Sequence, residues 1–340
     1  MHNNQPNKKA QTTRNDSLDV ITGIMILWMI CYHAFIWAKL THDATYKIGL
    51  HLFYYFMPWF YFKSGMFFRP LCESNQSLIE YTIKCSKSLL MPLATWWLAG
   101  YLVIIPELIF LNNEPLWKII TTPVYTFLMS GDTLGNGPLW FFISLFVVKV
   151  SGYYISRYKH FYFSSIFIIL VGFVLSKYKI ILPLSLSTVP IGLLFYFAGY
   201  LYSKQSVIFK NKYLIILLIL MLVICNYYYS SYVDVHLNKV KYGNYFIFSF
   251  ASLLTIPVLI YLSEMISSKI LSFIGNKSFY FFVLHWPVFY LVKAIYSRIL
   301  SINMADVHGY IYLLLLISVA LSVCLATIKM FGSNQLLFGK

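Results

Sequence analysis

His33 is the side chain in this sequence best placed for proton-transfer chemistry. It lies in a run of 19 residues, 20–38, that contains no Lys, Arg, Asp or Glu, and it is the side chain there that titrates near neutral pH. An ionisable group within a bilayer is costly to bury, so we expect His33 to face other helices or a water-filled cavity. Two interpretations remain open at this point: the imidazole takes up a proton during catalysis, or it only forms a hydrogen bond between helices.

Cations and a hydroxyl follow in the second apolar run. Lys63 and Arg69 lie at its inner end, where they could bind an anionic ligand or could reach the headgroup region as topology anchors. Ser64 precedes Gly65, and this pair could offer a hydroxyl and a close backbone approach to a ligand. Packing of small residues between helices is the equal alternative for the pair.

A second histidine lies near the C-terminus, within an aromatic stretch. His285 precedes Trp286 and Pro287. A proline cannot donate a backbone hydrogen bond, and it can therefore open a membrane helix toward a cavity. His285 and Trp286 are candidates for lining a substrate path, with a simple interhelical hydrogen bond as the alternative for His285. Trp140, which follows a Gly-Pro pair, could floor a site or could belong to the interfacial aromatic belt.

The composition identifies the kind of scaffold that must position these groups. Apolar residues make up 59% of the 340 residues, charged residues make up 11%, and the mean hydropathy is +0.70. These values predict an integral membrane protein. The net charge of +15 is spread between apolar runs rather than gathered on one face, which argues against nucleic-acid binding. The sequence has no His-Glu-x-x-His, P-loop, cysteine pair or acidic cluster, so we expect no metal.

The elements predicted to carry the site are about ten transmembrane helices in an all-α bundle. With the N-terminus in the cytoplasm, 16 of the 26 Lys and Arg residues fall on inner flanks, which places both termini in the cytoplasm. Residues 1–19 are expected to form a cytoplasmic tail and residues 20–340 one membrane domain, with 112–137 as a re-entrant or surface loop on the outside. The predicted helical runs are 20–38, 48–68, 89–111, 139–154, 161–175, 180–202, 213–229, 245–262, 279–296 and 310–328.

Several segments, taken in order, resemble one family. They are LDVITG at 18–23 with His33 beyond it, FYFKSGMFF at 60–68, KSLLMP at 87–92, GPLWF at 137–141, and IGNKS at 274–278 leading to His285. Each segment is weakly specific, but their shared order resembles membrane-bound acyltransferase family 3, whose members include O-acetyltransferases that decorate bacterial glycans. The resemblance covers residues 18 to 290.

The resemblance implies a reaction and its substrates. It implies a plasma-membrane O-acyltransferase, most simply an O-acetyltransferase, that moves an acyl group from acetyl-CoA, bound from the cytoplasmic side, to a hydroxyl of a cell-surface or lipid-linked glycan. Such a reaction needs a base, and a neutral imidazole, with a reference pKa of about 6.5, is suited to that role. His33 is therefore the expected catalytic base. The expected donor-binding residues are Lys63, Ser64 and Arg69, and the expected acceptor-binding residues are Trp140, His285 and Trp286.

One position departs from the family pattern. The family commonly has Arg or Lys eleven residues before the helix-one histidine, and this sequence has Thr22. The missing cation could come from Lys63, Arg69 or Arg14. Asp19 lies more than three helical turns from His33, too far to orient it directly, and is interpreted equally well as a residue that stabilises the first turn of the helix.

A transporter or flippase of lipid-linked or small polar molecules is the alternative function. His33, Lys63 and His285 would then line a conduction path. Secondary transporters are commonly built from repeated halves with interrupted helices, and no such repeat is visible in the sequence.

Overall fold

The computed structural model describes residues 16–110, 113–158, 160–228, 235–296 and 309–331. Within these residues the secondary structure is helical, with one isolated bridge between His236 and Lys241 and no β-strand. The α-helices are α1 (Asp16–Trp37), α2 (Ala44–Phe53), α3 (Phe56–Met66), α4 (Leu78–Cys85), α5 (Met91–Phe110), α6 (Leu116–Ser130), α7 (Trp140–Ile155), α8 (Ser164–Lys177), α9 (Val189–Lys204), α10 (Lys212–Tyr228), α11 (Tyr245–Ser263), α12 (Lys269–Asn276), α13 (Ser278–Ala294) and α14 (Gly309–Phe331).

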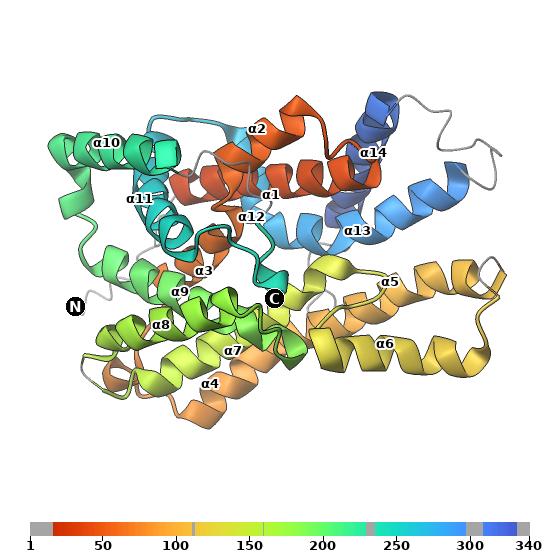
Figure 1. Cartoon of the computed structure of the whole chain (residues 1–340), viewed down its shortest axis with the longest axis horizontal. Coiled ribbons are helices and arrows are strands. Elements are labelled where there is room, and N and C mark those ends of the chain that lie inside the picture. Colours follow the sequence, from red (N-terminus) through yellow and green to blue (C-terminus); the bar gives the residue numbers. More distant parts are fainter. Residues whose placement is uncertain (1–15, 111–112, 159, 229–234, 297–308, 332–340) are drawn as a thin grey trace, which may run out of the picture.

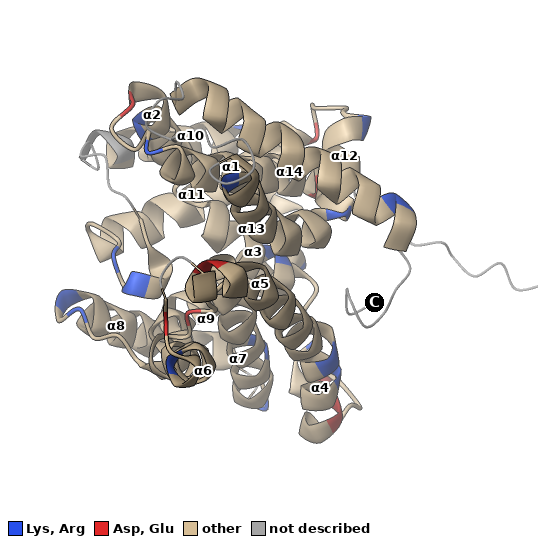
Figure 2. Ribbon diagram, turned by 90° about the vertical axis from the view of Figure 1, so that its right-hand side faces the viewer, with Lys and Arg blue, Asp and Glu red and all other residues tan. Residues whose placement is uncertain are grey.

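The helices form two groups that lie side by side (Figures 1 and 2). One group contains α1, α2 and α10 to α14, and the other contains α4 to α9. The short helix α3 connects them, because it packs along α9 in the second group and also contacts α1 in the first. Side chains of α1, α3 and α13 therefore meet residues of the second helix group near the middle of the molecule.

Among the described residues, six helical segments are long and apolar enough to cross a membrane. They are Asp16–Trp37, Leu78–Phe110, Gly137–Ile155, Pro183–Lys204, Tyr245–Ser263 and Gly309–Phe331. Two further apolar helices, Phe161–Lys177 and Lys212–Cys225, are shorter. Charged residues lie mainly toward helix ends and loops, and most of each helix carries none (Figure 2). The chain is thus an all-α, multi-pass membrane protein, while the count of ten spans and the cytoplasmic termini stay predictions.

The predicted single run at 48–68 is wrong, because the structure divides it into α2 and α3. The break lies at Tyr54 and Tyr55. Pro58, in the first turn of α3, has no N–H to donate to the carbonyl of Tyr54, and its ring crowds that carbonyl. A helix cannot continue unbroken through these residues, and α3, at 11 residues, is too short to span a bilayer alone.

The predicted run at 89–111 is part of a longer helical segment, Leu78–Phe110. A π-helical turn, Ser86–Leu90, joins α4 to α5. Pro92 is the second residue of α5, and its missing N–H leaves the Ser88 carbonyl without its regular α-helical partner. Such π-turns absorb this kind of interruption without ending the helix.

The structure also bears on two segment predictions, at the start of α1 and around α6. Residues 1–15 of the predicted tail lie outside the described residues, and α1 already begins at Asp16 rather than at residue 20. The segment 112–137 contains the 15-residue helix α6 and then a turn that enters the interior, where Thr133 and Asn136 are buried. Of the two alternatives predicted for this segment, a surface loop is therefore wrong for this turn, and a re-entrant loop stays a prediction.

Backbone-to-backbone contacts at glycines set the positions of α1 and α3. A Cβ added at Gly275 of α12 would lie 1.8 Å from the carbonyl oxygen of Asp19, and one added at Gly23 of α1 would lie 2.2 Å from that of Leu271. A Cβ at Gly65 of α3 would lie 1.8 Å from the carbonyl oxygen of Tyr196 in α9. Small residues permit such close helix approach in membrane proteins. Gly65 thus serves helix packing, one of the two interpretations of the Ser64–Gly65 pair.

Gly275→Ala should lower the thermal unfolding midpoint, because the backbone of α1 cannot move away from the new methyl group without shifting the helix. Overpacking of this kind typically costs about 1–3 kcal/mol. Circular dichroism of the detergent-purified protein measures the midpoint. Gly309→Ala is the matched control, since its added Cβ would meet only the mobile end of the Leu40 side chain, at 2.9 Å. Equal midpoints for the two variants would contradict the proposed contact.

Candidate active site

His33 lines a cavity of about 350 Å³ whose walls come from both helix groups. The walls come from the second half of α1, the start of α3, the turn before α7, the segment 235–239 and the middle of α13. The lining residues are Met29, Tyr32, His33, Ile36, Phe56, Met57, Asp132, Gly137, Pro138, Trp140, Val235, His236, Leu237, Asn238, Lys239, Phe282 and Trp286. His33 therefore lines an open space rather than lying in a sealed packing contact.

His33 and His285 form a direct pair behind this cavity. Nδ1 of His33 lies 3.0 Å from Nε2 of His285, and the two rings are nearly parallel, with an interplanar angle of 13°. His285 is fully buried, and its Nδ1 lies 2.9 Å from the carbonyl oxygen of Phe281. The two residues are 252 positions apart in the sequence.

These contacts determine which nitrogen carries each proton when both rings are neutral. The Phe281 carbonyl can only accept, so Nδ1 of His285 must donate to it. Nε2 of His285 then has a lone pair and accepts a hydrogen bond from Nδ1–H of His33. The remaining nitrogen of His33, Nε2, consequently has a free lone pair. The pair thus fixes His33 in the tautomer that a general base requires.

Tryptophan and tyrosine rings fix the orientation of His33 further. The Trp286 ring meets the imidazole edge-on, at a centroid distance of 4.9 Å and an angle of 88°. Tyr32 contacts it from the same helix at 5.1 Å. The Trp286 ring itself packs against Gly137, where an added Cβ would lie 3.2 Å from it. Trp140 lies on the cavity wall and is 9% exposed. The predicted residues His33, Trp140, His285 and Trp286 thus come together.

Asn136 is a site residue that the sequence did not reveal. Pro287 leaves the carbonyl of Val283, four residues earlier in α13, without its helical donor. Nδ2 of Asn136 donates to that carbonyl at 2.9 Å, and this bond ties the turn before α7 to the helix that carries His285 and Trp286. The Oδ1 atom of Asn136 is buried and has no hydrogen-bond partner among the described residues. Proline spacing indicates the free carbonyl, but no sequence signal indicates its partner.

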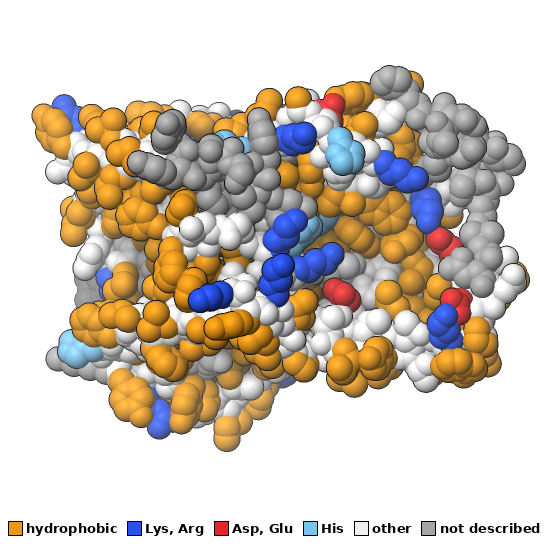
Figure 3. Space-filling model, viewed as in Figure 1, with side chains coloured by type: hydrophobic (Ala, Val, Ile, Leu, Met, Phe, Trp, Pro, Cys, Tyr) orange, Lys and Arg blue, Asp and Glu red, His pale blue; other side chains and the backbone are white. Residues whose placement is uncertain are grey.

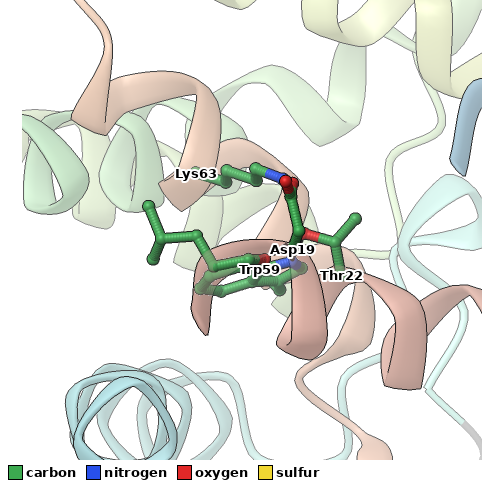
Figure 4. A network of polar contacts seen from close by, with 5 residues as sticks. Asp19, Thr22, Trp59 and Lys63 are labelled. Carbon is green, nitrogen blue, oxygen red and sulfur yellow. Dashed lines mark hydrogen bonds and ion pairs between the residues drawn. The ribbon is translucent and has the colours of Figure 1, made fainter. Parts of the chain in front are cut away.

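Lys63 belongs to a second polar cluster, at the other end of α1 (Figure 4). Its ammonium group lies 2.7 Å from Oγ1 of Thr22 and 3.3 Å from Oδ1 of Asp19. Trp59 donates from Nε1 to the Thr22 hydroxyl at 3.2 Å, and that hydroxyl donates to the Leu18 carbonyl at 2.6 Å. The Asp19 side chain, in the first turn of α1, is only 5% exposed, so it is a buried ion-pair partner of Lys63.

The Lys63 cluster and His33 lie on the same face of α1. Thr22 and His33 are eleven residues apart, close to three full turns, which separates them by about 16 Å along the axis. The ammonium group of Lys63 therefore lies beside the very position where the family pattern has a cation. Arg14 lies outside the described residues.

The other two residues predicted to bind the donor, like Lys63, are not among the described residues that line the His33 cavity. Ser64 is half-buried beside the packed Gly65, and Arg69 is exposed beyond the end of α3. The sequence also did not reveal the polar lining residues Asp132, His236, Asn238 and Lys239, because they lie on turns outside the predicted helical runs.

Comparison with protein families gives a match over most of the chain. A family model described as an acyltransferase domain, Acyl_transf_3, matches residues 15–328 of the 340 residues. No curated protein and no solved structure matches the chain significantly. The matched range includes both histidines, the Lys63 cluster and the whole cavity lining. The chain therefore belongs to the acyltransferase 3 family of membrane proteins.

Proposed function

We propose that the protein is a plasma-membrane O-acyltransferase, most simply an O-acetyltransferase, that uses acetyl-CoA to acylate a hydroxyl of a cell-surface or lipid-linked glycan. The observation that carries this proposal is the His33–His285 pair, which leaves a lone pair on a histidine at the wall of a cavity. A cavity of about 350 Å³ is within the size range of small-molecule sites.

The proposed reaction uses His33 as a proton shuttle. Nε2 of His33 takes the proton of the acceptor hydroxyl while the oxygen attacks the thioester carbonyl carbon, so that a C–O bond forms. The C–S bond then breaks, and the departing thiolate receives the proton from His33. The imidazolium that forms in between is stabilised because Nε2 of His285 accepts the hydrogen bond from Nδ1. No covalent acyl-protein intermediate is needed.

The cavity walls support a sugar as the acceptor. Trp140, Trp286, Phe56 and Phe282 provide aromatic surfaces, and the polar groups lie at separate points of the lining. Such a combination of apolar walls with a few placed polar groups is typical of small-molecule recognition. The aromatic surfaces suit the C–H faces of a pyranose ring, while the polar groups suit its hydroxyls.

The Lys63 cluster supports a donor site at the other end of the same helix face. An ammonium group is a suitable partner for the phosphates of coenzyme A. A donor anchored near Thr22 would extend its acyl end along α1 toward His33. The same ion pair also keeps a buried carboxylate, Asp19, compensated.

Lys63→Met, combined with Asp19→Asn, should raise the KM for acetyl-CoA about tenfold or more while kcat changes less. The second substitution removes the carboxylate that would otherwise be left buried without Lys63, so the fold is preserved. Initial rates at varied acetyl-CoA measure both constants, and Lys84→Met, an exposed lysine of α4, is the control. A normal KM in the double variant would restrict Lys63 to a structural role.

A transfer assay tests the function itself. Purified protein in detergent or vesicles is incubated with radiolabelled acetyl-CoA and isolated glycan, and we expect the label to appear on the glycan as a base-labile ester. Glycan that moves across vesicle membranes without gaining label would instead establish the transporter alternative and contradict the proposal.

A further inference from the structure

The segment 235–242 is a short hairpin that lies over the His33 cavity. Its two ends are joined by reciprocal backbone hydrogen bonds, from His236 N–H to the Lys241 carbonyl at 2.9 Å and from Lys241 N–H to the His236 carbonyl at 3.0 Å. Between them is one 3₁₀ turn, Leu237–Lys239. The hairpin is thus a defined structure rather than an irregular linker.

Buried apolar residues fix this hairpin to the rest of the protein. Val235, Leu237, Val240 and Tyr242 are all buried, between 9% and 2% exposed. Val240 adopts a left-handed backbone conformation with φ of +54°, which is unfavourable for a β-branched residue. Such strain costs on the order of 1–3 kcal/mol and persists where the surrounding packing enforces it, often at functional sites.

The consequence of this geometry is that polar residues of the hairpin reach the cavity. His236, Asn238 and Lys239 all line it, and Lys239 is exposed. Nδ1 of His236 lies 3.4 Å from the hydroxyl of Tyr32, the residue that precedes His33. Lys241 on the same hairpin is exposed but is not among the described lining residues. Figure 3, in the same view as Figure 1, shows Lys and Arg side chains gathered near the middle of the visible face, where the surface is hollowed.

The cavity lining also contains a carboxylate, from a segment distant in sequence from the hairpin. Asp132 lines the cavity from the turn before α7. The ionisable lining groups are therefore Tyr32, His33, Asp132, His236 and Lys239. A ligand with sugar hydroxyls and one anionic group would fit this pattern, because a carboxylate accepts hydrogen bonds from hydroxyls and an ammonium group binds the anion.

We propose that the hairpin 235–242 selects an acidic acceptor, with Lys239 binding a carboxylate or phosphate group of the glycan beside the hydroxyl that His33 deprotonates. This inference rests on the proposed acyltransferase function and names the chemical class of its acceptor. Specificity arises because a neutral glycan would leave Lys239 without its partner while making all other contacts.

The experiment compares pairs of acceptors that differ only in charge. A uronic-acid oligosaccharide is compared with its methyl ester, and a phosphorylated oligosaccharide with its dephosphorylated form, in the acetyl-transfer assay. We expect wild-type kcat/KM to be at least about tenfold higher for the acidic member of one pair, and the identity of that pair distinguishes carboxylate from phosphate.

Variants assign the preference to the hairpin. Lys239→Met should raise the KM for the acidic acceptor to that of the neutral one, with the KM for acetyl-CoA unchanged. Lys241→Met, on the same hairpin but away from the cavity, should keep the preference.

Equal rates for both members of each pair would overturn the inference and leave the proposed function intact. A raised KM for acetyl-CoA in Lys239→Met would also overturn it, because the lysine would then bind the donor. Absence of transfer to every acceptor would refute the proposed function, and this inference with it.

Discussion

Replacing His33 with alanine should lower the kcat of acetyl transfer by about 10²–10⁴-fold, the usual contribution of a general base. The imidazole lines the cavity with its Nε2 lone pair uncommitted, and among the described lining residues the other histidine, His236, lies on the hairpin. Loss of His33 leaves the acceptor hydroxyl to react without a positioned base. Initial rates at saturating acetyl-CoA and glycan give the change in kcat.

A matched control separates the chemical effect from an effect on folding. His51→Ala removes a histidine of α2 that is not among the described cavity residues, and its kcat should equal that of the wild type. Unfolding midpoints of both variants should remain close to the wild-type value. If His33→Ala retains more than about a tenth of the wild-type kcat, His33 is not the base.

His285→Leu should lower kcat by about 10²–10³-fold with a much smaller change in the KM of either substrate. His285 is a positioning residue: it is fully buried and acts through its hydrogen bond to Nδ1 of His33. Without that acceptor, His33 can adopt the other tautomer, whose Nε2 carries a proton and cannot accept one. The imidazolium formed during the reaction would also lose its hydrogen-bond partner.

His285→Gln distinguishes this positioning role from simple packing. The glutamine side chain can place an amide oxygen near the position of Nε2 and can therefore accept from His33, so we expect it to recover at least about tenfold of the kcat lost in His285→Leu. The thermal unfolding midpoints of both variants are measured alongside their kcat, and similar midpoints exclude a difference in folding as the cause. Equal activities in the two variants would contradict the tautomer mechanism, because a packing role does not distinguish an acceptor from a methyl group.

The sequence predicted the helical membrane scaffold, three of the residues that line the cavity, and His285, which contacts His33 behind it. His33 and His285 were detectable because titratable groups within apolar runs are costly to bury. Their direct contact was not predictable, since the pair is separated by 252 positions and depends on how α1 and α13 pack. The same limit applies to Lys63, whose place beside Thr22 follows from the contact of α1 with α3.

Local helix boundaries were predictable only in part. Hydropathy merges α2 and α3 into one run, because the break at Tyr54 and Tyr55 depends on one missing backbone donor at Pro58 and leaves the apolar pattern unchanged. Asn136 and the hairpin 235–242 carry no periodic pattern at all, and their roles depend on contacts with distant helices.

The pH dependence of kcat, measured side by side for the wild type and His33→Ala, tests most directly whether a neutral His33 takes the hydroxyl proton. The wild-type kcat should rise about tenfold per pH unit at low pH and then reach a plateau, since only the unprotonated imidazole is active. The residual kcat of His33→Ala should lack this ionisation. The same rising limb in both proteins would contradict the role of His33, because another group would then be the one that must lose its proton.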